Sequence, residues 1–188
     1  MDNPIVIVLI IIVALVLLIG LWYISTMNSL RQLEVKVGEA DSGIDVALTK
    51  RFDALSKLVN TTKGYAKHEA SIFENVTKWR KGLPDSLTIE QKQEFLGRMN
   101  EVQSGINVAV ENYPDLKADK VFINLQNSIN EVEAHLQAAR RLYNSNVSTL
   151  NQRIVTFPVS IVAGQIKMAK KAFFEAEVAK RQDVDVSF

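Results

Sequence analysis

The chain has 188 residues, with 22 basic and 21 acidic residues and a formal net charge of +1 at pH 7. This near balance provides no excess of positive charge for nucleic acid, so no nucleic-acid partner is expected. The absence of cysteine excludes disulfides, thiolate catalysis and cysteine-bound zinc.

An uncharged apolar run from Ile5 to Ile24 is the first feature along the chain. About twenty helical residues at ~1.5 Å per residue cover ~30 Å, the hydrocarbon thickness of a bilayer. A cleaved signal peptide is the alternative, but the run is too long, and it has neither a basic leader nor a small-residue cleavage site. We therefore expect a transmembrane anchor over residues 1–24. Its span residues include Ile5, Leu9, Ile12, Leu18, Trp22 and Ile24.

The orientation of this anchor follows from its flanks. Arg31 and Lys36 lie within about 20 residues after the run, whereas no Lys or Arg precedes it. The positive-inside rule then places the bulk of the chain in the cytoplasm, behind a single span in the inner (cytoplasmic) membrane. The lipid bilayer is thus the first expected partner.

The remainder of the chain is predicted to be all-α. Apolar residues step by three and four between Pro84, Pro114 and Pro158, and no alternating strand pattern occurs. Such narrow, long stripes indicate helices that pack along their length in an antiparallel bundle or coiled coil. The stripes are Leu30, Leu33, Val37, Ala40, Ile44, Leu48, Phe52, Leu55 and Val59; Phe95, Met99, Val102, Ile106, Ala109 and Tyr113; and Phe122, Leu125, Ile129, Val132, Leu136, Ala139, Tyr143, Val147, Leu150, Ile154 and Phe157.

Turn and cap residues divide this region into about four helices. Gly64 ends a first helix that runs on from the span, and further helices are expected near 65–81, 88–112 and 119–157. Thr88 with Gln91 forms a capping box, and Asp119 is a candidate N-cap. The helix-turn motifs are Gly64, Tyr65, Tyr113, Pro114, Asp115 and Pro158. We expect a bundle over residues 25–157 and a tail over 158–188.

The segment from Gly64 to Phe73 contains the side chains of a possible active site, but in an unsuitable pattern. A zinc-peptidase helix needs a second histidine four residues after His68, and that position is Ile72. The other histidine, His135, lies among solvated polar residues. Since no phosphate loop or nucleophile motif occurs either, we expect no catalytic residue, no metal site, no cofactor and no enzymatic activity.

The tail allows two interpretations. As a helix from Val159 to about Arg181, it would place its apolar residues on one face and its lysines on the rest. That face either caps the bundle or lies in a membrane interface, with the lysines at anionic headgroups. The residues of the possible interface are Val162, Ile166, Lys167, Lys170, Lys171 and Phe173. An even number of alternating helices would bring this tail back beside the lipid.

Several blocks in the chain resemble the LemA family. They read GIDVAL (43–48), LVNTTKGYAKHE (58–69), VENYPDLKA (110–118), RRLYNSNVSTLNQRI (140–154), FPVSIVAG (157–164) and FFEAE (173–177). The resemblance implies a bacterial-type, single-span membrane protein with an elongated helical bundle, usually cytoplasmic, and it implies no enzymatic activity. Asp41 departs from the aromatic residue expected there, so an aromatic contact is lost. The stretch after Gly164 also departs from the pattern and looks more regularly helical.

Two functional hypotheses remain after this reading. The first is a structural scaffold that is anchored in the membrane and self-associates as a homo-oligomer. The alternative is an adaptor that holds a partner, such as a membrane protease, at the membrane. Neither hypothesis requires catalysis.

Overall fold

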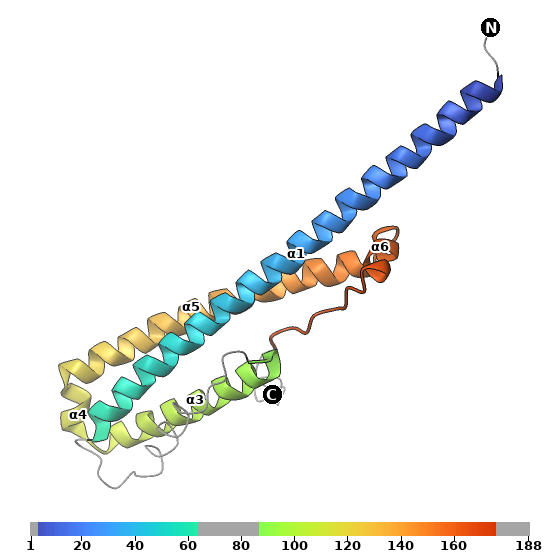
Figure 1. Ribbon diagram of the computed structural model, residues 1–188. Coiled ribbons are helices and arrows are strands. Elements are labelled where there is room, and N and C mark those ends of the chain that lie inside the picture. Colours follow the sequence, from blue (N-terminus) through green and yellow to red (C-terminus); the bar gives the residue numbers. More distant parts are fainter. Residues whose placement is uncertain (1–3, 64–86, 176–188) are drawn as a thin grey trace, which may run out of the picture. The chain divides into compact units, whose positions relative to one another are not determined.

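The computed structural model describes residues 4–63 and 87–175, and these ranges contain helices, turns and the non-helical segment 168–175, with no strand in them (Figure 1). The helices are α1 (Pro4–Lys63), α3 (Ile89–Glu111), α4 (Pro114–Ala118), α5 (Lys120–Val155) and α6 (Val159–Gln165). The all-α prediction is therefore confirmed. The helix expected near 65–81 lies outside the described residues.

The chain divides into two compact units, and each is described by itself. The first unit comprises Met1–Glu39 and Ser145–Ala172, and the second comprises Ala40–Asn144 and Phe173–Phe188. Helices α1 and α5 each contribute one part to the first unit and one part to the second.

In the second unit, α1, α3 and α5 pack around an aliphatic core. Arg51 of α1 contacts Glu133 of α5 and Asn100 of α3, while Lys92 of α3 contacts Asp41 of α1. The contacts of Lys92 and Arg51 make α3 parallel to α1. Helix α5 is antiparallel to both, because Glu133 lies at Arg51 whereas Tyr143, ten residues later, lies near Asp41 and Glu90 (Figure 1). The core residues, each no more than 1% exposed, are Ile44, Leu55, Leu58, Met99, Ile106, Leu116, Ile129 and Leu136. Those of them that belong to the predicted stripes are thus confirmed as core.

The helix starts in this unit follow the predicted cap chemistry. At the start of α3, the backbone N–H of Thr88 donates to Gln91 Oε1 at 2.8 Å, and the N–H of Gln91 donates to Thr88 Oγ1 at 3.3 Å. At the start of α5, Asp119 Oδ1 accepts from the N–H groups of Val121 and Phe122 at 2.7 and 3.3 Å. Both caps satisfy N–H groups that the helix itself leaves free.

The one-turn helix α4 was not predicted, because the sequence indicated only a turn at this place. Pro114 occupies its first turn, where the missing N–H of proline costs nothing. Leu116 is then fully buried, which holds this short helix against the bundle.

In the first unit, α5 runs antiparallel to α1. The side-chain amide of Asn146 donates to the carbonyl of Lys36 at 3.0 Å, and Arg153 Nη2 donates to Ser29 Oγ at 3.3 Å. The apolar contacts of this unit bury Leu30, Val37, Val147, Leu150 and Val162. The C-terminal end of α5 therefore returns to the part of α1 next to the apolar run.

The regular helix predicted from Val159 to about Arg181 is wrong. Helix α6 ends at Gln165, Lys167 has a φ of 52°, and residues 168–175 are not helical. Instead, the Asn151 side chain accepts from the N–H of Lys171 and donates to its carbonyl, both at 2.9 Å. Both backbone groups of Lys171 are thus paired with a side chain of α5 and are not available to a helix ladder.

Candidate functional site

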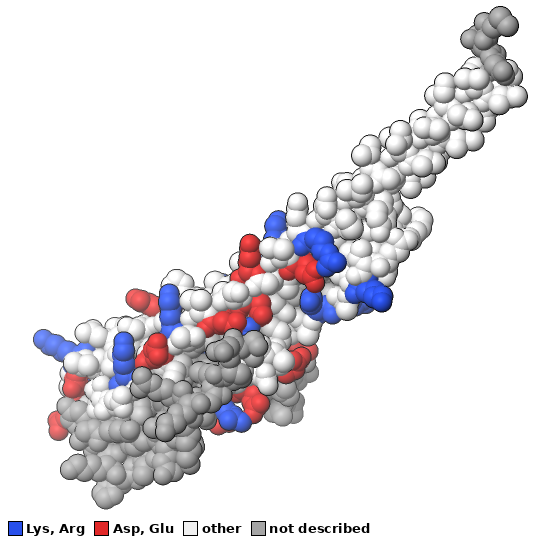
Figure 2. Space-filling view, viewed as in Figure 1, with Lys and Arg blue, Asp and Glu red and all other residues white. Residues whose placement is uncertain are grey.

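The apolar part of α1 is bare. Every side chain from Pro4 to Trp22 is exposed, and cover by other residues begins only at Tyr23, which is half-buried. In Figure 2 this part of α1 is an unbroken white surface without acidic or basic side chains. Among the described residues, α1 is the one helix long and apolar enough to cross a membrane.

All six predicted span residues belong to the exposed class. Ile5, Leu9, Ile12, Leu18, Trp22 and Ile24 are between 40% and 72% exposed. Large apolar side chains are not stable in water over such a length, because each costs about 1.5–3 kcal/mol when left exposed. This part of the helix therefore needs an apolar environment that the rest of the described chain does not supply.

The residues first considered for chemistry form no site in the described part of the chain. His135 is exposed on α5, as predicted for a surface histidine, while His68 lies outside the described residues. Over residues 4–63 and 87–175, no group of three or more His, Cys, Asp or Glu side chains could hold a metal ion.

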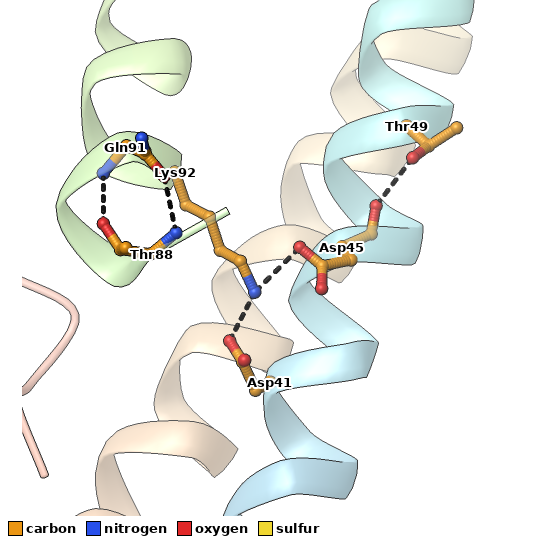
Figure 3. Close-up of polar contacts among 6 residues, drawn as sticks. All are labelled: Asp41, Asp45, Thr49, Thr88, Gln91 and Lys92. Carbon is orange, nitrogen blue, oxygen red and sulfur yellow. Dashed lines mark hydrogen bonds and ion pairs between the residues drawn. The ribbon is translucent and has the colours of Figure 1, made fainter. Parts of the chain in front are cut away.

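A buried lysine links α3 to α1 (Figure 3). Lys92 is 1% exposed, and its Nζ lies 2.6 Å from Asp41 Oδ1 and 2.8 Å from Asp45 Oδ1. The two carboxylates come from successive turns of α1, so both face α3, and their side chains remain 36% and 49% exposed. The ammonium is therefore neutralised where it is dry, while the two acids keep access to water. Asp41, predicted only to lose an aromatic contact, instead makes an ion pair.

A buried arginine connects the long helices α1, α3 and α5 in the second unit. Arg51 is 4% exposed, and its Nη2 donates to Asn100 Oδ1 at 2.6 Å and to Gln103 Oε1 at 3.0 Å, both on α3. Its Nη1 lies 3.0 Å from Glu133 Oε2 on α5. The planar guanidinium can serve several acceptors at fixed angles, which suits a cross-link between helices.

Two acidic groups near these contacts have shifted pKa values. Burial, and to a smaller extent the negative charges of Asp41 and Glu90, raises the pKa of Tyr143 to about 12. The pKa of Glu90 is lowered by a backbone hydrogen bond and by the Thr88 hydroxyl at the start of α3. The shift of Tyr143 is thus explained mainly by its burial, and that of Glu90 by the helix cap.

The turn motifs are only partly described. Gly64 and Tyr65 lie outside the described residues. Tyr113 precedes α4, and Pro114 and Asp115 form its first turn. Pro158 directly precedes α6, and α5 ends at Val155, so the predicted stop at this proline is confirmed.

The residues predicted for a tail interface do not share one face. Val162 is fully buried in the first unit, and Ile166 is half-buried at the end of α6. Lys167, Lys170, Lys171 and Phe173 are exposed but lie outside any helix. The single amphipathic face is lost because the helix that would create it stops at Gln165.

The sequence analysis missed the buried charges of the second unit. Lys92 lies four residues before Leu96 and seven before Met99, so it occupies a core position of the α3 stripe. Arg51 likewise adjoins the buried Phe52. Both residues could have been identified from the sequence, because each is a basic residue at a position where the helical spacing of its neighbours predicts an apolar one.

Together, these features define a class of protein in which a single membrane-competent helix continues into a packed helical domain. The family model of the LemA family matches residues 40–188. A relative named "Protein LemA" from Metamycoplasma hominis is 28% identical over 177 residues, which cover 92% of this chain and 80% of the relative. The chain belongs to the LemA family.

Proposed function

We propose that this protein is a membrane-anchored scaffold, in which α1 crosses the bilayer and copies of the chain self-associate while the helical domain lies in the cytoplasm. The observation that carries the proposal is the continuity of α1. The helix is bare and uncharged from Pro4 to Trp22, and it runs without a break to Lys63, where Leu55, Leu58 and Val59 are buried.

This continuity matters for a scaffold. A flexible linker would separate a domain from its anchor. Here one helix contains the bare part and also supplies core side chains, so anchor and domain are joined without a linker. Residues 30–59 of α1 supply many core side chains, so the helix cannot unwind at the membrane surface without exposing them.

The anchor is tested with charges in the bare part of α1. The variant Ile12→Arg/Val16→Arg should lose resistance to alkaline carbonate extraction, because each arginine at the centre of a span costs about 2.5–3.5 kcal/mol on insertion. Val46→Arg, at an exposed position of α1 in the second unit, is the matched control and should stay in the membrane pellet. Full retention of the double variant in the pellet would contradict the anchor.

Self-association is supported by small residues on the bare helix. A Cβ at Gly20 would meet nothing within 4 Å in one chain, so this position and Ala14 leave room for a second span to approach. The mass of the detergent-solubilised particle, measured by light scattering in several mild detergents, tests this step. A multiple of 21.1 kDa is expected. A monomer in every detergent would refute self-association and favour the adaptor.

The cytoplasmic location is tested with a C-terminal alkaline phosphatase fusion in intact bacteria. Arg31 and Lys36 predict an inactive fusion, because the phosphatase folds to an active form only outside the cytoplasm. An active fusion would reverse the orientation and leave the anchor itself intact.

A further inference from the structure

An exposed apolar corner joins α5 to α6 in the first unit. Its members are Val155, Phe157 and Ile161, which are 56%, 78% and 53% exposed. Phe157 is the most exposed apolar residue among those described. Residues 154–166 also carry no Asp, Glu, Lys or Arg, which makes the corner the longest uncharged stretch that follows the apolar run of α1.

The register of the first unit fixes the height of this corner along α1. Asn146 contacts Lys36, and Arg153 contacts Ser29, so each step forward on α5 corresponds to one step back on α1. Helix α5 ends at Val155, and the register carried to that residue places it about level with residue 27 of α1. That level is ~7.5 Å, or about five helical residues, from Trp22, and Phe157 follows in the turn between α5 and α6.

The charges of the two helices end at the same level. Arg31 is the first charged residue of α1 after the bare part, and Arg153 is the last charged residue of α5. The register places these two residues within about one helical turn of each other along α1. In the bare part of α1, from Pro4 to Trp22, and on to Leu30, no residue is charged. After Arg153 the chain likewise carries no charge until Lys167, which follows α6.

Basic residues lie next to the corner. Residues 145–172 carry Arg153, Lys167, Lys170 and Lys171 and no acidic residue. The Asn151 contacts with Lys171 return the tail to the level of Arg31 and Glu34 on α1, and Lys171 Nζ lies 3.8 Å from Glu34 Oε1. Figure 2 shows Lys and Arg side chains gathered near the end of the white part of α1. Basic residues directly beside an uncharged apolar segment are favoured at an anionic headgroup layer.

We infer that the α5–α6 corner is a second membrane contact, which inserts Val155, Phe157 and Ile161 into the interface of the leaflet that α1 enters. The inference rests on the membrane anchor proposed above and extends it. We assign lipid as the contact of this corner for two reasons. The corner lies close to the end of the span along α1, and its uncharged segment begins at the same level as the uncharged segment of α1. Two attachment points, at α1 and at the corner, prevent the first unit from tilting about a single helix.

The test uses the full chain, which has no cysteine, so single cysteines can be labelled with an environment-sensitive fluorophore. Phe157→Cys and Ile161→Cys carry the probe in the corner. Ile12→Cys serves as the positive control within the span, and Val35→Cys, at an exposed site of α1 in the first unit, serves as the aqueous control. Each labelled protein is reconstituted in phosphatidylcholine–phosphatidylglycerol vesicles, with and without nitroxide-labelled lipid.

We expect blue-shifted emission at residues 157 and 161, and a loss of fluorescence in nitroxide vesicles, as at residue 12 and unlike residue 35. Emission at 157 and 161 that matches residue 35 would overturn the corner contact while leaving the anchor in place. A blue shift without nitroxide quenching would mean that protein covers the corner, a second copy for example, and would also overturn it. Absence of quenching at residue 12 would refute the anchor itself.

Discussion

The Lys92 ion pairs provide the sharpest test of how the second unit is held together. The ammonium is 1% exposed, whereas its partners Asp41 and Asp45 keep 36% and 49% of their side-chain exposure. Because burial is this unequal, the two halves of the interaction are expected to respond differently to mutation. Removal of the lysine leaves two acids that water can solvate, but removal of the acids leaves a dry, unpaired charge.

The expected magnitudes follow from that difference. In Asp41→Asn/Asp45→Asn, the uncompensated lysine should destabilise the domain by about 3–5 kcal/mol. In Lys92→Met, a side chain of similar length fills the same space without a desolvation cost, so the free energy of unfolding should change by less than about 1 kcal/mol. For a chain of this size the double acid variant should melt on the order of 10 °C below Lys92→Met.

The assay is thermal unfolding of the full chain in mild detergent, followed by circular dichroism. Lys50→Met and the double variant Glu39→Gln/Asp53→Asn, at exposed positions of α1, control for the loss of one positive and of two negative charges. The reasoning is refuted if Lys92→Met unfolds at a lower temperature than the double acid variant. It is also refuted if the double acid variant melts with its control.

Three further predictions concern the same unit. Arg51→Lys should cost about 1–3 kcal/mol in denaturant unfolding, because one ammonium cannot replace hydrogen bonds to Asn100 and Gln103 together with the ion pair to Glu133; wild-type stability would contradict the cross-link. Thr88→Ala should cost about 1 kcal/mol by loss of the capping box, whereas Thr61→Ala, whose exposed hydroxyl bonds only within α1, should cost less. The pKa of Tyr143 is raised to about 12 in the folded state, against ~10 in the unfolded chain. Its contribution to the free energy of unfolding is therefore fully present below pH ~10 and is lost as the pH rises from ~10 to about 12. Tyr143→Phe should abolish that alkaline loss, on the order of 2–3 kcal/mol, while Tyr113→Phe should retain it.

Much of the helical architecture was predictable from periodicity and caps. The stripes through Ile44, Met99 and Leu136 identified core faces because apolar burial dominates the choice of helix face. The Thr88 and Asp119 caps were predictable because their hydrogen bonds are local in sequence. Such features depend on neighbours within one helical turn, which the sequence displays directly.

The buried charges depend on contacts that are distant in sequence. Lys92 finds Asp41 and Asp45 about fifty residues away, and Arg51 finds Glu133 more than eighty residues away. A lysine that occurs at the spacing of the apolar residues of a helix can mark the end of the apolar face, extend to solvent or enter the core. Only the parallel arrangement of α1 and α3 decides that Lys92 enters it, and this arrangement is not encoded in the periodicity of either helix.

The tail shows how such a distant contact can override local helix propensity. Its sequence supports a helical face, yet side chains of α5 satisfy its backbone groups one residue at a time. In the first unit Asn151 pairs with both backbone groups of Lys171, and in the second unit Asn144 pairs in the same way with Phe174, at 2.8 and 2.9 Å. Phe174 is then buried, with the Arg140 guanidinium 4.7 Å from the centroid of its ring, whereas Phe173 of the predicted apolar face is exposed. Asn144 and Asn151 lie seven residues apart, on one face of α5, and two amides that can each satisfy one N–H and one C=O favour an extended segment beside a helix over a second helix. Because this pairing keeps Lys171 and Phe174 against α5, the tail does not form the amphipathic helix that its apolar periodicity predicted.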